Sequence, residues 1–416
     1  MEEIINRIED LKNPDNIIRY EAIEFISDFF DMHRNESLKE YAIPKIIEPL
    51  INCLKDSDSD VRFNAAMALA RLRYPRGVEY LIECLKHSDP GMRESAASKL
   101  GELGDTSAVE SLIECLKDDA KDVQTSAIWA LGKLGDSKAL QPLTECLNAS
   151  DLEVRIRTAD ALGNLGDSGG IDLLLPCLKD KERSLRKAAA NALGKLGGLK
   201  ALDYLLECLK DKDLGVRAIT ASALGNLKSS KAVDPLIKCL QDKKFKVRAK
   251  AAEALGELGY PVAVESLIEM LNDNESDVRA SSAKALGKLG DLRAIEPLIK
   301  GLKDEDLWVR VWSAAALGEL GDTRAIEPLI KLLKDKEKRV QFWAAKALGE
   351  LGDGNAISPL INYLKDKTPR VRATAAETLG KLGDPKAISP LKELLEDEYE
   401  VVREAAEKAL RKLTEN

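Results

Sequence analysis

Seven cysteines recur at a fixed spacing, and these thiols are the residues of the sequence best placed to do chemistry. Closely placed thiolates bind zinc, with sulfur about 2.3 Å from the metal, and thiols whose Cα atoms lie within roughly 7 Å can form disulfides. Both reactions require the cysteines to come together, so the interpretation depends on the elements that carry them. The cysteines, each 31 residues from the next, are Cys53, Cys84, Cys115, Cys146, Cys177, Cys208 and Cys239.

The same 31-residue step governs the surrounding sequence from about residue 46 onward. An apolar residue followed by Arg or Gln recurs at this step, as in Val216-Arg217, Val247-Arg248 and Val278-Arg279. A fixed period of this length is typical of stacked helical units in a solenoid. Equivalent helices of neighbouring units lie about 8–10 Å apart, too far for disulfides or a shared metal. The cysteines are therefore predicted to be small, buried, apolar side chains of a reduced intracellular protein, with no metal site.

Residues 325–353 illustrate how one unit is expected to fold. Apolar residues at helical spacing predict a first helix, charged residues 334–339 a turn, and residues 338–351 a second helix. Gly352 is expected to end that helix in the αL conformation, and Gly349 to make room for a neighbouring helix. Counted from the apolar residue of the dipeptide, the second, third, sixth and tenth positions are predicted to be exposed, forming one ladder along the solenoid.

Few residues outside this pattern suggest catalysis. The two histidines, His33 and His87, lie in no metal-binding motif. The Gly-x-x-Gly sequences, such as residues 287–290, follow helices and lack the Lys-Ser/Thr of a phosphate loop, so they are predicted to be helix ends. The sequence favours a non-catalytic protein with no catalytic residue and no cofactor.

Composition narrows the range of partners. The net charge of −8 and the pI of about 5.3 argue against a dedicated nucleic-acid binder, which needs a basic surface. No apolar run approaches the roughly 18–20 residues of a membrane span, and the first residues are charged, unlike a secretory signal. A cytoplasmic, monomeric protein that binds neither nucleic acid nor membrane is expected.

The repeated motifs resemble HEAT repeats, in particular the short form named after phycobilisome lyase subunits. The matching features are the Val-Arg dipeptide, the Ala-Ala that follows it, and the Leu-Gly-x-Leu-Gly-Asp ending, as at residues 286–291. The resemblance implies an all-α, right-handed solenoid of about thirteen helix pairs whose second helices line a concave binding surface. It also implies that the dipeptide arginines, such as Arg217 and Arg279, pair with loop carboxylates between units and are structural.

One enzyme of the resembled family, deoxyhypusine hydroxylase, binds two irons through repeated His-Glu pairs. In this sequence His33 precedes Arg34 and His87 precedes Ser88, so that activity is not expected.

The chain is predicted to be a single solenoid over residues 1–416 with distinct ends. Residues 1–45 form a divergent N-terminal cap, residues 46–395 the regular repeats, and residues 396–416 a C-terminal capping helix. Ile18-Arg19 is a divergent dipeptide, and the next follows 43 residues later, so twelve residues are inserted around positions 29–41. In the middle of the chain the loop aspartate is absent from three successive units, which indicates either a softer region or sequence drift. The residues in its place are Gly198, Ser229 and Tyr260.

Large aromatic residues on the exposed ladder are the strongest candidates for a binding site. Trp312 and Trp343 share the third position of consecutive units and are predicted to lie side by side, with Phe342 adjacent and Trp308 at the start of the helix of Trp312. Trp129 takes the sixth position of an earlier unit and Phe63 the second position of the first regular one. Such a concentration is typical of a binding hot spot. The alternative is that these rings pack over aliphatic stems and stabilise the stack.

The sequence therefore predicts a scaffold or adaptor that binds a helix or extended segment of another protein. A phycobilisome-lyase-like accessory or chaperone subunit handling a tetrapyrrole or another cofactor is the alternative, and a structural spacer is a third possibility. Charge on the same ladder is mixed, and Glu253 and Glu257 are expected to face Lys284 and Lys288 of the next unit.

Overall fold

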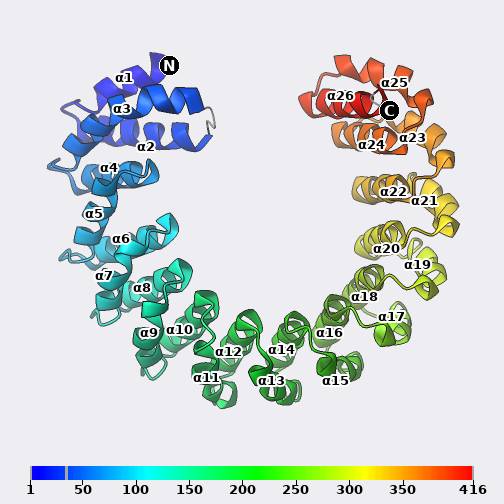
Figure 1. The fold of residues 1–416 in the computed structure, drawn as a ribbon, viewed down its shortest axis with the longest axis horizontal. Coiled ribbons are helices and arrows are strands. Elements are labelled where there is room, and N and C mark those ends of the chain that lie inside the picture. The colour runs from blue at the N-terminus through cyan, green and yellow to red at the C-terminus, as the bar shows by residue number, and fades with distance from the viewer. Residues whose placement is uncertain (1, 33–35, 415–416) are drawn as a thin grey trace. The chain divides into compact units, whose positions relative to one another are not determined.

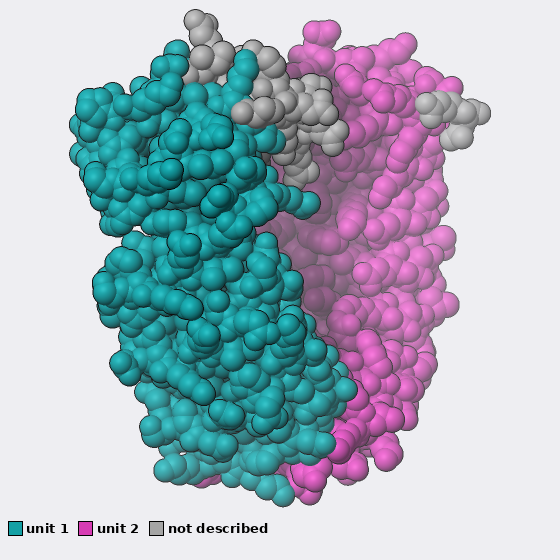
Figure 2. Space-filling model, turned by 60° about the vertical axis from the view of Figure 1, so that its left-hand side comes forward, with its two compact units in different colours: residues 1–196 teal, residues 197–416 magenta. Residues whose placement is uncertain are grey.

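The computed structural model describes residues 2–32 and 36–414, and these residues form α-helices and short 3-10 helices with no strand among them. The predicted all-α solenoid is confirmed, and His33 falls outside the described residues. The helices group into two compact units, residues 1–196 and residues 197–416, coloured separately in Figure 2. Each unit is a stack of helix pairs.

The first unit contains the pairs from the N-terminus to residue 196. Its α-helices are α1 (Glu2–Asp10), α2 (Asn16–Met32), α3 (Glu36–Cys53), α4 (Ser59–Arg71), α5 (Pro75–Cys84), α6 (Pro90–Leu103), α7 (Val109–Cys115), α8 (Lys121–Leu134), α9 (Leu140–Cys146), α10 (Leu152–Leu165), α11 (Gly170–Leu174) and α12 (Arg183–Leu196). Its 3-10 helices are η1 (Thr106–Ala108), η2 (Ser137–Ala139) and η3 (Pro176–Lys179). The helices α6, α8, α10 and α12 pack in succession.

The second unit repeats this arrangement more regularly. Its α-helices are α13 (Leu202–Cys208), α14 (Leu214–Asn226), α15 (Val233–Cys239), α16 (Phe245–Leu258), α17 (Val264–Met270), α18 (Ser276–Leu289), α19 (Ile295–Gly301), α20 (Leu307–Leu320), α21 (Ile326–Leu332), α22 (Lys338–Leu351), α23 (Ile357–Tyr363), α24 (Pro369–Leu382), α25 (Ile388–Glu393) and α26 (Glu400–Thr414). Within this unit the even-numbered second helices form the inner layer and the odd-numbered first helices the outer layer (Figure 1).

Most first helices of the second unit are preceded by a 3-10 turn that the sequence pattern did not reveal. These turns are η4 (Leu199–Ala201), η5 (Ser230–Ala232), η6 (Pro261–Ala263), η7 (Leu292–Ala294), η8 (Thr323–Ala325), η9 (Gly354–Ala356) and η10 (Pro385–Ala387), and η11 (Leu394–Glu396) follows α25. Aspartate caps several of them, because the Asp291 side chain accepts a hydrogen bond from the Arg293 amide and Asp322 accepts one from Arg324. In the three repeats that lack this aspartate, the residue in its place (Gly198, Ser229 or Tyr260) makes no side-chain cap.

Glycine inside most second helices, from α6 to α24, sets how closely neighbouring second helices pack. An ideal Cβ on Gly256 would lie 2.7 Å from the Ala285 Cα atom, and one on Gly349 would lie 2.8 Å from Thr378 Cγ2. The space predicted at Gly349 is therefore filled by the next second helix. Gly352, which ends α22, has a φ of 71°, so the predicted αL cap is also confirmed.

Paired arginine and aspartate side chains join consecutive repeats. In the second unit the Arg279 guanidinium donates two hydrogen bonds of 2.8 Å to the Asp304 carboxylate, 25 residues later, and one of 2.9 Å to the Asp273 carbonyl of its own turn. Arg217 contacts Asp242 in the same way, at 2.8 and 3.0 Å. The structural role expected of these arginines is thus confirmed.

The N-terminal dipeptide belongs to the same set of pairs. Arg19 donates hydrogen bonds of 2.6 and 2.8 Å to Asp56, which is 37 residues away instead of 25. The difference of twelve residues equals the predicted insertion, which falls where the long helices α2 and α3 follow each other. Arg19 therefore makes the contact of a regular repeat across a longer connection.

The cysteines are free thiols within the helix pairs. Cys53, Cys84, Cys115, Cys177 and Cys239 are buried, and Cys146 and Cys208 are half-buried. Burial raises the pKa of Cys53, Cys84, Cys115 and Cys239 to about 11. These thiols are protonated and enclosed, so they pack as small apolar groups.

Candidate functional site

The candidate site lies on the solvent-facing side of helices α20 and α22 in the second unit. The 31-residue register places Trp312 and Trp343 at the same turn of these neighbouring second helices. Their ring centroids are 6.1 Å apart, and Phe342 meets Trp343 edge to face at 5.6 Å. Contacts of this geometry are favourable for aromatic pairs. We call Trp312, Phe342 and Trp343 the aromatic cluster.

All three rings of the aromatic cluster are half-buried, whereas Trp308 at the start of α20 is 42% exposed. Trp308 contacts no other aromatic ring among the described residues. Its ring is instead covered by the Arg339 guanidinium of α22, which lies 4.8 Å from the ring centroid. The structure therefore brings three of the four aromatic residues into direct contact, whereas Trp308 contacts an arginine of α22, the helix that carries Phe342 and Trp343.

Each ring of this site carries a cation. Lys284 of α18 lies 4.7 Å from the Trp312 centroid, Lys346 lies 4.5 Å from Trp343, and Arg370 of α24 lies 5.1 Å from Phe342. These distances are within the range of cation–π attraction, which is worth roughly 0.5–1 kcal/mol at exposed positions. Together with Arg339, the four cations form what we call the cation set.

Carboxylates occupy the next turn, at the tenth position of the second helices. Burial raises the pKa of the Glu319 carboxyl, and the neighbouring Glu350 raises it further. Glu257 has the opposite shift, because a hydrogen bond from Lys288 lowers its pKa. The solvent-facing surface of these helices thus changes along the helix axis from aromatic and cationic to acidic.

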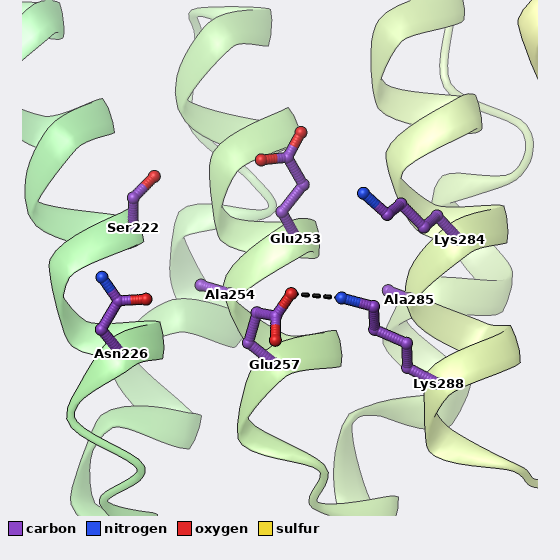
Figure 3. A pocket seen from close by; sticks show the side chains of 8 residues that line it. All are labelled: Ser222, Asn226, Glu253, Ala254, Glu257, Lys284, Ala285 and Lys288. Carbon is purple, nitrogen blue, oxygen red and sulfur yellow. Dashed lines mark hydrogen bonds and ion pairs between the residues drawn. The ribbon is translucent and has the colours of Figure 1, made fainter. Parts of the chain in front are cut away.

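A polar hollow adjoins the aromatic cluster between α14, α16 and α18. Its lining includes Ser222, Asn226, Glu253, Glu257, Lys284 and Lys288, and Figure 3 shows these side chains converging from the three helices. The predicted pair of Glu257 with Lys288 is confirmed. Glu253 and Lys284 also face the same hollow, but no ion pair joins them: Glu253 pairs with Lys250 at 2.6 Å, and Lys284 lies over the Trp312 ring.

The structure also corrects the expectation that the second position of the ladder is exposed. Val311 is fully buried, and Ala280 and Ala373 are also buried. This position points to the flank where adjacent second helices meet, and their close packing leaves little room for solvent. Phe342 remains half-exposed there because its ring extends over Trp343.

The two remaining candidates belong to the first unit. Trp129 on α8 is 37% exposed, and Lys133 of the same helix lies 5.0 Å from its ring centroid. Phe63 on α4 is half-buried, and α6 lies between α4 and α8 in the order of stacking. Among the residues that the structure describes, neither has a cluster of aromatic rings around it comparable to that on α20 and α22.

The cation set was not anticipated from the sequence, although a signal for part of it exists. Lys346 follows Trp343 by three residues, about one helical turn. Lys284 occupies the same position of its repeat as Lys346, two repeats earlier, and its helix lies next to the helix of Trp312. Seeing this requires the repeats to be aligned and their helices placed side by side.

The described residues contain no group of three or more His, Cys, Asp or Glu side chains able to hold a metal ion. None of their helices combines the length and apolar composition needed to cross a membrane.

Comparison with known proteins identifies the repeats across the chain. A family model described as HEAT repeats matches residues 6–98, 78–155, 141–224, 209–287, 264–340 and 326–411. A search of curated proteins gives no match.

Solved structures resemble the fold at low sequence identity. The Kap95p chain of a structure with RanGDP is 12% identical, with a TM-score of 0.59 over 99% of this chain and 66% of that one. Importin beta is 14% identical, with a TM-score of 0.56 over 99% and 67% of the two chains. A Kap121p mutant is 15% identical, with a TM-score of 0.54 over 99% and 53%. This chain therefore spans about half to two thirds of the length of these proteins, and the likeness shows the fold alone.

Proposed function

Because this chain belongs to the family of HEAT repeats, we propose that it is a non-catalytic scaffold or adaptor that binds another protein on the inner side of its second helices. The observation that carries the proposal is the aromatic cluster of Trp312, Phe342 and Trp343, with the exposed Trp308 beside it. Large aromatic side chains are enriched at the centres of protein interfaces.

The spacing of the aromatic rings supports a helix or an extended segment as the element that binds. Rings on consecutive second helices are separated by one repeat, so a segment crossing the helices meets one anchor after another. The structurally similar Kap95p binds RanGDP, which supports protein recognition as a use of this fold. We propose that Trp129 and Phe63, which lie in the first unit, make secondary contacts with the partner protein.

The proposal extends to the state and location of the protein. Seven free cysteines favour a reducing compartment such as the cytoplasm, and we propose that the chain acts there as a monomer with no nucleic-acid or membrane partner. We also propose that its repeats belong to the short phycobilisome-lyase type, which the 31-residue period favours.

Affinity purification from native lysate, followed by mass spectrometry, tests the proposed function. Wild-type protein is compared with Trp312→Ala/Trp343→Ala and with Val262→Ala/Leu292→Ala, a control that removes two exposed apolar side chains (66% and 53% exposed) outside the aromatic cluster. We expect a protein retained by the wild type and the control to be lost from the tryptophan variant.

Circular dichroism distinguishes lost binding from lost folding. The tryptophan variant loses an aromatic contact worth about 0.5–1.5 kcal/mol beyond the burial of two half-buried rings, and the loss is confined to two repeats of a long array. Its helical signal should therefore change little, and its melting only modestly. A collapse of the melting transition would show that the rings only stabilise the stack. An absorbance scan of the eluate tests the alternative function: a pigment that co-purifies would support a cofactor-handling accessory subunit instead.

A further inference from the structure

The cations on the aromatic rings indicate what kind of segment this surface accepts. Each member of the cation set, Lys284, Arg339, Lys346 and Arg370, lies 4.5–5.1 Å from a ring centroid. None of the four has a carboxylate within the 4.0 Å of an ion pair among the described residues. Glu319 attracts Lys284 and Lys346 only from beyond ion-pair distance, so the four cations remain available to pair with a carboxylate of a partner.

Several other cations of the second unit pair with carboxylates. Lys250 pairs with Glu253 at 2.6 Å, Lys338 pairs with Asp366 at 2.8 Å, and Lys288 pairs with Glu257. The dipeptide arginine Arg310 pairs with Asp335 at 2.8 Å. The cations of the cation set are instead held over aromatic rings, beside the surface on which the partner is proposed to bind.

We propose that the segment bound by the aromatic cluster is acidic, with apolar or aromatic side chains interspersed among Asp and Glu residues. The apolar side chains would pack against the edges of Trp312, Phe342 and Trp343, and the carboxylates would pair with the cation set. This inference rests on the proposed protein-binding function and specifies the chemistry of the partner.

A basic segment fits the same surface poorly. The ring faces already carry cations, so an incoming Lys or Arg would have to displace them against like-charge repulsion. A nucleic acid would supply both negative charge and stacking bases. A phosphate chain carries a charge at every nucleotide and therefore cannot avoid the net charge of −8 and the carboxylates of Glu319 and Glu350, whereas a peptide with acids interspersed among apolar residues can place its few carboxylates at the cation set.

Labelled synthetic peptides test the proposal by fluorescence anisotropy. One peptide of about fifteen residues alternates Asp and Glu with Leu and Trp, and matched peptides replace the acids by Lys and Arg or by Gln and Ser. A single-stranded oligonucleotide of similar length is the fourth probe. We expect the acidic peptide to bind tightest, and its binding to weaken as salt is raised.

Two variants assign the binding to the surface. Lys284→Gln/Arg339→Gln/Lys346→Gln/Arg370→Gln should weaken binding of the acidic peptide roughly tenfold or more, since four charge contacts are lost. Lys300→Gln/Lys331→Gln, which removes two exposed lysines from first helices of the same unit, should leave it nearly unchanged. Melting curves of both variants confirm that they are folded.

The possible outcomes separate this inference from the proposed function. Equal binding of the uncharged peptide, lost only in Trp312→Ala/Trp343→Ala, would overturn the acidic chemistry and leave protein binding in place. Tighter binding of the basic peptide or of the oligonucleotide, or no binding of the acidic peptide by the wild type, would also overturn it. The proposed function fails on a separate result, the retention by the folded tryptophan variant of every protein captured by the wild type.

Discussion

The buried cysteines show how a reactive type of side chain can serve for packing alone. The cysteine ladder is enclosed between helices, and burial raises the pKa of four of its thiols to about 11. Thiolate is the reactive form of cysteine, so a raised pKa and poor access both suppress reaction.

We therefore expect the cysteines to resist alkylation in the native protein. With iodoacetamide at pH 8, mass spectrometry should show little labelling of Cys53, Cys84, Cys115 and Cys239, and full labelling after denaturation in guanidinium chloride. Rapid stoichiometric labelling under native conditions would contradict the packing role.

One cysteine position is occupied by glycine beside a buried serine. Gly301 takes the place of cysteine in its repeat, and an ideal Cβ there would lie 2.4 Å from the Ser313 hydroxyl. Ser313 is fully buried and its hydroxyl has no hydrogen-bond partner among the described residues. Repeats that keep a cysteine can also carry a hydroxyl residue at this place, as Thr220 does with Cys208. At Gly301, however, the serine hydroxyl occupies the space that a side chain would need.

This exchange predicts coupled effects on stability. Gly301→Cys alone should destabilise by about 1–3 kcal/mol through overpacking, whereas Ser313→Ala should be neutral or stabilising because it removes an unpaired hydroxyl. Gly301→Cys/Ser313→Ala should recover most of the loss. Chemical denaturation of the four proteins measures the coupling, and additive effects would contradict it.

Helices are held to their neighbours by the arginine–aspartate pairs, and these contacts depend on charge. The guanidinium of Arg93 lowers the pKa of Asp118, and that of Arg372 lowers the pKa of Asp397. A carboxyl whose pKa is lower in the folded state stabilises the protein above its unfolded pKa of about 3.9 and loses that contribution as pH falls through the folded value.

Thermal melts should therefore shift to lower temperature between about pH 4 and pH 2, with little change between pH 5 and 7. A double variant supplies the control. In the repeat with Gln124 the position 25 residues later is Ala149, so Arg279→Gln/Asp304→Ala reproduces a pair that occurs naturally. It should cost less stability than the sum of the single changes and reduce the acid sensitivity. Additivity of the single changes would show that the pair is not coupled.

The sequence pattern predicted the second helices well but predicted contacts between them less well. The helix expected at residues 338–351 spans Lys338–Leu351, because the apolar period and the glycine end are local signals. The contact of Lys284 with the Trp312 ring was not predicted, since the choice between Glu253 and Trp312 depends on the side-chain directions of neighbouring helices. The 3-10 turns capped by Asp291 and Asp322 were not predicted, because a cap depends on the backbone geometry around it.

At the scale of the molecule, a solenoid is held together by contacts between successive repeats, as between α14, α16 and α18 in the second unit. Leu236 is fully buried in the second unit, and Leu236→Ala should cost roughly 2–5 kcal/mol locally. Because nearest-neighbour stacking is all that connects distant repeats, this loss should split urea-induced unfolding into two transitions. Circular dichroism detects the split, and hydrogen exchange locates the less stable segment. A single sharp transition would contradict nearest-neighbour cohesion.

The constant 25-residue separation of the arginine and aspartate partners bears on how such a chain is assembled. The arginines make equivalent contacts in successive repeats: Arg217 with Asp242, Arg248 with Asp273 and Arg279 with Asp304. The contact that joins two of these repeats is therefore the same whichever pair of repeats it connects. A duplication or deletion of 31 residues therefore preserves every joint that remains. The length of the array is free to change by recombination within the gene, while the aromatic surface, confined to two adjacent repeats, is inherited as a unit.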